Sequence, residues 1–145
     1  MAELNELIRK LKRVNVHSKV TQRVLQSVHV DTDRRIFRDG IDANSKLIGV
    51  YSASYQKTRR LKNYPISRKV ILQATGQMVN DYRFLVLPDG NYGSGFSNIK
   101  NFDKSEWVED TYEYKRDGIF GLTVNEEKSI GIRMEKELTK FLAKL

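Results

Sequence analysis

The chain has 145 residues, of which 26 are Lys or Arg and 18 are Asp or Glu, so its formal net charge is +8, and 39% of its residues are hydrophobic. This length and apolar fraction fit a single domain with a modest core and argue against a fibrous repeat or a disordered tail. The sequence has no Cys, which excludes disulfide frameworks, thiolate zinc sites and thiol nucleophiles. Its longest apolar run, residues 84–87, is far shorter than the roughly 20 residues that span a bilayer, and its polar start, MAELNELIRK, lacks a signal-peptide apolar region. We therefore expect a soluble protein made in the cytoplasm.

The positive charge is concentrated in the first half of the chain. Residues 1–75 hold 16 basic and 6 acidic side chains and residues 76–145 hold 10 basic and 12 acidic ones, so the halves carry +10 and −2. No acid occurs between Asp42 and Asp81. The basic segment in this stretch comprises Lys57, Arg59, Arg60, Lys62, Arg68 and Lys69. Such a segment attracts phosphates or an acidic protein surface, and the alternative is a solvated face that acids elsewhere in the fold neutralise.

The N-terminal pattern predicts a helical arm over residues 1–38. Apolar residues recur on one helical face at positions 4, 7, 8, 11 and 14, and a second stripe runs at multiples of four from Val20 to Ile36, with Thr32 in the gap. Asp39 and Gly40 are expected to end the helix. Because β-branched valines lower helix propensity, a break is expected near residues 15–18.

The middle of the chain predicts short elements joined by loops. Turn formers in residues 41–49 indicate a small hairpin or tight loop, and Ser52 is placed to cap a short helix. Residues 69–74 alternate as in a strand. Thr75 then follows as the expected cap of a helix that reaches Tyr82.

A hairpin and a further helix are predicted next. Pro88, Asp89 and Gly90 form a strong turn signal between strands expected at Arg83–Leu87 and Asn91–Ser97. Helical periodicity resumes around Trp107, with Asp103 as the expected cap.

The C-terminal helix, predicted over residues 123–145, has the clearest signal. Thr123 and Glu126 form a capping box after the linker 117–122. Its apolar stripe comprises Ile130, Met134, Leu138, Phe141, Leu142 and Leu145. Helices, short strands and further helices in this order indicate a single α+β domain with a long N-terminal helical segment, a small antiparallel sheet and a C-terminal amphipathic helix.

Motifs for catalysis, metals and cofactors are missing from the sequence. His17 and His29 fit no metal-binding spacing. Gly93 and Gly95 form half of a dinucleotide-binding loop, but Asn98 takes the third glycine position and the flanks indicate a hairpin. There is no phosphate-binding loop and no serine nucleophile elbow, and neither histidine has an obvious Ser partner in the sequence. We predict no enzyme activity, no metal and no cofactor.

Two further clusters have both functional and structural interpretations. The acidic segment comprises Glu106, Glu109, Asp110 and Glu113. Paired carboxylates can act as general acid and base, but this spacing on a helix favours a solvated acidic face. Tyr51, Tyr55 and Tyr64 interleave with the basic segment, as in proteins that stack bases and neutralise phosphates, or they cover the edge of the core with their hydroxyls in water.

Several segments in order resemble the virion-morphogenesis or tail-completion proteins of tailed bacteriophages, which join head to tail. The resemblance rests on IDANSKLIGVYSASYQKTRR, KVILQATGQMVNDY, the GFSN segment and GIFGLTVNEE, and covers residues 41–127. The matching positions are Ile41, Asp42, Ile48, Gly49, Tyr51, Ser52, Tyr55, Arg59, Thr75, Gly76, Met78, Gly95, Phe96, Phe120, Leu122, Thr123 and Glu126. The sequence departs from the family pattern at two places. Ser45 stands where the loop usually has Gly, and the segment KNYPISRK before the Thr-Gly-x-Met junction replaces a segment that usually contains Gly.

The resemblance implies a structural neck protein that forms a ring of identical subunits in the virion, assembled in the host cytoplasm. Portal, adaptor or tail-tube proteins would be its partners, and DNA would pass through the ring on ejection. No membrane partner is expected.

Rings need heterologous contacts, in which one patch meets a different patch on the next subunit. We therefore hypothesise that the basic segment meets the acidic segment of a neighbour or of a partner ring. A second hypothesis places the basic segment in the lumen, in weak, salt-sensitive contact with DNA. The alternative from another class is a small basic nucleic-acid-binding regulator.

Overall fold

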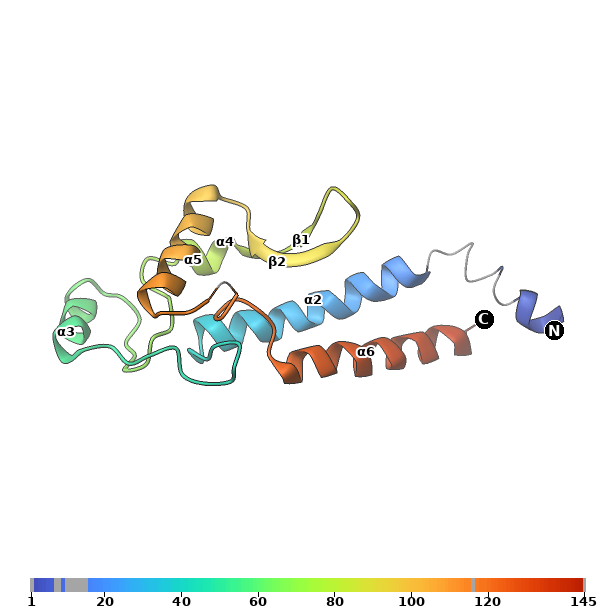
Figure 1. The fold of residues 1–145 in the computed structure, drawn as a ribbon, viewed down its shortest axis with the longest axis horizontal. Helices are drawn as coiled ribbons and strands as arrows, with labels where there is room; N and C mark the ends of the chain where they lie inside the picture. Colours follow the sequence, from blue (N-terminus) through green and yellow to red (C-terminus); the bar gives the residue numbers. More distant parts are fainter. Residues whose placement is uncertain (1, 7–8, 10–15, 116, 145) are drawn as a thin grey trace.

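The computed structural model describes residues 2–6, 9, 16–115 and 117–144. After helical residues 2–6, the elements are α2 (Val16–Phe37), α3 (Ala53–Leu61), α4 (Gln77–Asp81), β1 (Tyr82–Val86), β2 (Tyr92–Phe96), α5 (Ile99–Thr111) and α6 (Val124–Ala143) (Figure 1). Helices with a two-stranded antiparallel sheet confirm the predicted α+β class. The predicted stripe positions 7, 8, 11 and 14 lie outside the described residues. Helix α2 begins within the stretch where a break is expected.

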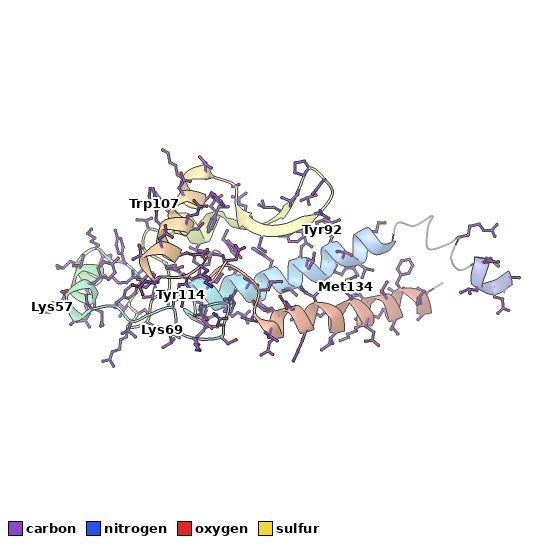
Figure 2. The ribbon with its side chains drawn as sticks, viewed as in Figure 1. Lys57, Lys69, Tyr92, Trp107, Tyr114 and Met134 are labelled. Atoms are coloured by element: carbon purple, nitrogen blue, oxygen red, sulfur yellow. The ribbon has the colours of Figure 1, made fainter. Side chains whose placement is uncertain are left out.

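Helices α2 and α6 run antiparallel, side by side, along the molecule (Figure 1). Buried Val20 and Val24 of α2 pack against the predicted stripe of α6, and Met134 lies between the two helices (Figure 2). The stripe members in this contact are Ile130, Met134, Leu138 and Phe141. Leu142, which was predicted to belong to the stripe, is 44% exposed, and Leu145 lies outside the described residues.

The N-terminus of α6 is held by the predicted capping box and by a buried ion pair. The Thr123 hydroxyl accepts from the Glu126 N–H at 3.0 Å, and the Glu126 carboxylate accepts from the Thr123 N–H at 3.1 Å. The same carboxylate accepts from Arg35 Nε at 3.1 Å and from the Thr32 hydroxyl at 3.1 Å. Both charged residues are buried, so the cap of α6 is bonded directly to the last turns of α2.

Arg35 also bonds to the loops on both sides of the core. Its Nη1 donates to the carbonyls of Ile41 at 3.0 Å and Ile119 at 3.1 Å, and its Nη2 donates to the carbonyl of Gly121 at 2.6 Å. One guanidinium thereby joins α2, the 41–49 loop, the 117–122 linker and α6. These segments are far apart in the sequence and meet at the same place in the fold.

The main core lies at the C-terminal end of α2. It contains Ile36, Phe37, Ile48, Val70, Tyr82 and Ile119. Helix α2 ends as predicted, since Gly40 follows with a φ of +65°. A Cβ at Gly40 would lie 2.2 Å from the carbonyl oxygen of Val70, so only glycine fits this close approach. The 41–49 segment is a tight loop, as predicted, with an isolated bridge between Ile41 and Leu47.

The predicted hairpin is confirmed. Strands β1 and β2 pair antiparallel, with Phe84 opposite Ser94. The turn at residues 88–90 closes with Gly90 at a φ of +85°. Rings of Tyr82 and Phe96 from the two strands lie 5.3 Å apart and continue the aromatic core, in which Phe120 packs edge-on against Phe96 at 5.6 Å.

The predicted strand at residues 69–74 and the predicted Thr75 cap are wrong. Leu72 has a φ of +53°, which breaks an extended strand, and only Val50 and Lys69 form an isolated bridge nearby. Helix α4 begins after Gly76, whose left-handed backbone (φ +85°) makes it the N-cap without a side-chain hydrogen bond. Thr75 is exposed and caps nothing. Tyr82 belongs to β1, since the extended backbone there ends α4.

Helix α5 begins before the predicted Asp103 cap. Asn98 is its N-cap, with its side-chain oxygen accepting from the Lys100 N–H at 2.9 Å. The Asp81 carboxylate accepts from the Ser97 hydroxyl and, at 2.9 Å, from the Asn98 N–H. These bonds fix the start of α5 to the end of α4. Hydrogen bonds lower the pKa of Asp81 to about 2. The bond from the Ser97 hydroxyl has the largest effect, and those from Asn98 and Asn101 have smaller effects.

Replacing Glu126 with Gln tests the buried ion pair. Gln keeps the capping box, since Gln also serves at that position, but leaves the Arg35 charge buried without a carboxylate. We expect a loss of about 3–5 kcal/mol in the free energy of unfolding, measured by urea titration. The matched control is Glu127→Gln on the exposed side of the same turn, with a change within about 0.5 kcal/mol. Equal losses of stability for the two substitutions would contradict a stabilising role for the buried Arg35–Glu126 pair.

The Asp81 carboxyl is expected to titrate at about pH 2 in the folded protein. Because its folded pKa lies below the ordinary value of 3.8, its contribution to stability is complete above that value and is lost as pH falls through the folded pKa. Carboxyl-carbon NMR measures the midpoint. Ser97→Ala removes the largest cause and should move the midpoint towards 3.8, whereas an unchanged midpoint would show that Ser97 does not hold the charge.

Candidate functional site

Helix α3 carries Lys57, Arg59 and Arg60 of the basic segment, and Lys62, Arg68 and Lys69 follow it in the chain. Ser52 is the N-cap, as predicted, and accepts from the Tyr55 N–H at 3.2 Å. Lys57, Arg60, Lys62 and Arg68 are exposed, and Figure 2 shows Lys57 at one end of the molecule. Lys69 is half-buried beside its bridge to Val50. Within the described residues, none of the four exposed cations has an ion-pair partner.

Arg59, predicted as an interface residue, is instead a buried structural residue with 2% of its surface exposed. Its Nε and Nη2 donate to the Pro65 carbonyl at 3.1 and 2.8 Å, and Nη2 also donates to the Gln73 carbonyl at 2.5 Å. The guanidinium carbon lies 4.6 Å from the centre of the Tyr51 ring. Arg59 thus faces inward and ties α3 to the loop that follows it.

The three predicted base-stacking tyrosines surround Arg59. The guanidinium carbon lies 5.8 Å from the ring centres of both Tyr55 and Tyr64, in addition to its closer contact with Tyr51. Tyr51 and Tyr64 are half-buried and Tyr55 is 38% exposed. Cation–π contacts of this kind stabilise a desolvated guanidinium, so these rings serve the interior of the fold.

The acidic segment is only partly a surface. Glu106 and Asp110 are exposed on α5, and Glu113 is exposed just after the helix, with a φ of +59°. Glu109 is buried, and its carboxylate accepts from the Gly118 N–H at 2.9 Å. Burial raises the pKa of Glu109. The prediction that Glu109 lies on the interface is therefore wrong, because this side chain holds the 117–122 linker.

Exposed apolar side chains lie within both charged segments. On the basic side, Leu61 is 85% exposed and Ile66 is 79% exposed. On the acidic side, Trp107 is 64% exposed (Figure 2). We call Lys57, Arg60, Leu61, Lys62, Ile66 and Arg68 the basic surface, and Glu106, Trp107, Asp110 and Glu113 the acidic surface. Apolar residues rimmed by charge are typical of protein interfaces.

Most matching positions of the resemblance serve the fold. The buried Asp42 carboxylate accepts from the N–H groups of Asn44 and Lys46 at 2.8 and 3.0 Å and from the Tyr114 hydroxyl at 2.5 Å, which closes the 41–49 loop. At Gly49, a Cβ would lie 3.3 Å from the Tyr112 ring, so the loop packs closely on α5. Met78 and Phe120 pack against the main core.

The structure pairs His29 with Ser94, a contact that the sequence does not indicate. His29 Nδ1 lies 2.8 Å from the Ser94 hydroxyl, because the hairpin packs across α2. Burial lowers the pKa of His29, and its ring centre lies 5.0 Å from that of Tyr82. No described carboxylate hydrogen-bonds to His29, so the pair lacks the third group that orients a catalytic base. The contact attaches the hairpin to α2.

The described residues contain no group of three or more His, Asp or Glu placed to hold a metal ion. None of the described helices is long and apolar enough to cross a membrane. Comparison with known proteins gave no matching family model, no matching curated protein and no matching solved structure.

Replacing Arg59 with Gln should destabilise the protein, whereas replacing the neighbouring Arg60 should not. Arg59→Gln leaves the Pro65 and Gln73 carbonyls without their donors, at an expected cost of about 2–4 kcal/mol. Arg59→Lys should also destabilise, since an ammonium lacks the planar fork. Denaturant midpoints measure all three variants. A midpoint for Arg59→Gln equal to that of Arg60→Gln would contradict the buried role.

Proposed function

We propose that this chain is a structural virion protein that forms a ring at the head-to-tail junction of a tailed bacteriophage. In this role it joins head to tail beside portal, adaptor or tail-tube proteins and lets DNA pass. The ordered resemblance over residues 41–127 motivates the family. The observation that carries the proposal is the pair of oppositely charged surfaces, which form no ion pair among the described residues and each carry exposed apolar side chains.

The two surfaces suit a heterologous contact. The basic surface carries Leu61 and Ile66 among unpaired cations, and the acidic surface carries Trp107 among Glu106 and Asp110. Each surface therefore combines exposed apolar side chains with charged ones, and the charges of the two surfaces have opposite signs. A contact between unlike patches generates a ring when its rotation closes.

The regulator alternative has less support from the geometry. The tyrosines that would stack bases enclose Arg59 instead. The exposed cations remain suited to phosphate contact. The second hypothesis for the basic surface, weak contact with DNA in the lumen of the ring, therefore stays open. Strong duplex binding at physiological salt by a protein of one or two subunits would favour the regulator.

Reversing charge on the basic surface should prevent assembly without unfolding the chain. The variant is Arg60→Glu with Lys62→Glu, since Arg59 must be left intact. The matched control, Lys128→Glu with Lys144→Glu, makes the same charge change at an exposed position of α6 and at its exposed C-cap. Sedimentation should give a multi-subunit particle for the wild type and the control, and a monomer with unchanged circular dichroism for the variant. Normal assembly of the variant would refute the contact.

A further inference from the structure

A groove between α3 and α5 contains a buried cation without a carboxylate partner. Its volume is about 430 Å³. It is lined by Tyr51, Tyr55, Arg59, Leu72, Gln73, Ala74, Met78, Val108, Thr111 and Tyr112. No described carboxylate forms an ion pair with Arg59, although a buried charge is usually paired.

The hydrogen bonds of Arg59 leave the Nη1 group of the guanidinium with unused donor capacity. Nε and Nη2 are bonded to the Pro65 and Gln73 carbonyls. Nη1 has only a 3.4 Å contact with the Tyr51 hydroxyl, longer than the roughly 2.7–3.2 Å of an ordinary N–H···O bond. An Nη1 group carries two N–H donors, so Arg59 retains donor capacity beside Tyr51, where both side chains line the groove.

Phenol groups add neutral donors around this end. The Tyr51 and Tyr55 rings lie 5.1 Å apart, and Tyr112, the C-cap of α5, also lines the groove. Burial raises the pKa of Tyr112, the neighbouring Tyr51 and Tyr55 phenols raise it further, and Arg59 acts in the opposite direction. Tyr112 therefore stays a neutral O–H at physiological pH, and an anion would meet a cation and phenol donors with no negative charge among the lining residues.

The remaining wall of the groove is apolar. Leu72, Met78 and Val108 line it and are all partly buried against the main core. They offer a surface for methylene groups or a flat ring. The groove thus combines an anion-receptive end with an apolar side, a combination typical of small-molecule sites.

We propose that this groove binds a carboxylate carried on an apolar or aromatic stem. One guanidinium with neutral phenol donors matches a single negative charge better than the double charge of phosphate. A free organic acid or an acidic side chain of an adjoining molecule would supply the same chemistry. The benzoate site stands on the groove alone, and only the choice between these two sources rests on the proposed assembly.

Benzoate is the probe for this site. Tyrosine-ring NMR shifts of the full chain, followed during titration, should saturate with benzoate and identify Tyr55 and Tyr112 as the perturbed residues. Benzamide has the same shape without the charge and should bind at least tenfold more weakly, since hydrogen bonds to a charged group are the stronger ones. Inorganic phosphate should not displace benzoate. Equal affinity for benzoate and benzamide would overturn the proposal.

Two variants distinguish binding in the groove from general attraction of benzoate to the positively charged surface. Tyr55→Phe with Tyr112→Phe keeps both rings but removes two donors, and should weaken benzoate binding roughly tenfold. Arg60→Gln removes a neighbouring exposed charge and should leave the affinity unchanged. If Arg60→Gln weakens binding as much as the double variant does, the attraction is diffuse and the site is refuted.

Sedimentation in the presence of benzoate identifies the natural source of the carboxylate. If benzoate binding reduces the particle size, an acidic side chain of a neighbour occupies the groove. If saturating benzoate leaves the size unchanged, an acidic side chain at the subunit contact is excluded and a free organic acid remains as the source. Both results require the benzoate site, and its absence in the NMR titration refutes either source.

Discussion

The buried ion pair between Arg35 and Glu126 is the interaction on which the rest of the fold depends. Arg35 lies near the end of α2, Glu126 lies in the first turn of α6, and the remaining guanidinium donors hold the Ile41 carbonyl and the 117–122 linker. A buried pair of this kind is costly to desolvate, but the penalty is offset when further hydrogen bonds satisfy both charges. Here it sets the position of α6 along α2 and of the loops that carry the core residues Ile48 and Ile119.

A second buried arginine organises the other end of the molecule by different means. Arg59 has carbonyl oxygens and tyrosine rings in place of a carboxylate, so α3 and the loop after it form a unit with an uncompensated positive charge. Among the described residues, its exposed basic neighbours form no ion pair. Within this short segment, Arg59 therefore stabilises the fold, whereas the exposed Lys57, Arg60 and Lys62 provide the positive surface charge.

The features predicted correctly from the sequence are those encoded locally. The Thr123–Glu126 box, the Ser52 cap and the turn at residues 88–90 each depend on a few adjacent residues. The inward positions of Arg59 and Glu109 depend on partners from other segments, such as Gln73 and Gly118, and charge patterning cannot reveal them. Three tyrosines near Arg59, in a stretch without acids, were the available signal for its burial.

Cross-linking between single-cysteine variants tests the contact between the basic and acidic surfaces most directly, because the chain has no cysteine of its own. Leu61→Cys and Asp110→Cys are prepared separately, mixed and oxidised. We predict a disulfide-linked pair of one variant with the other, and little linkage of either variant with itself. Cross-linking of Leu61→Cys only with itself, or no cross-linking in the mixture, would contradict a heterologous contact between these surfaces.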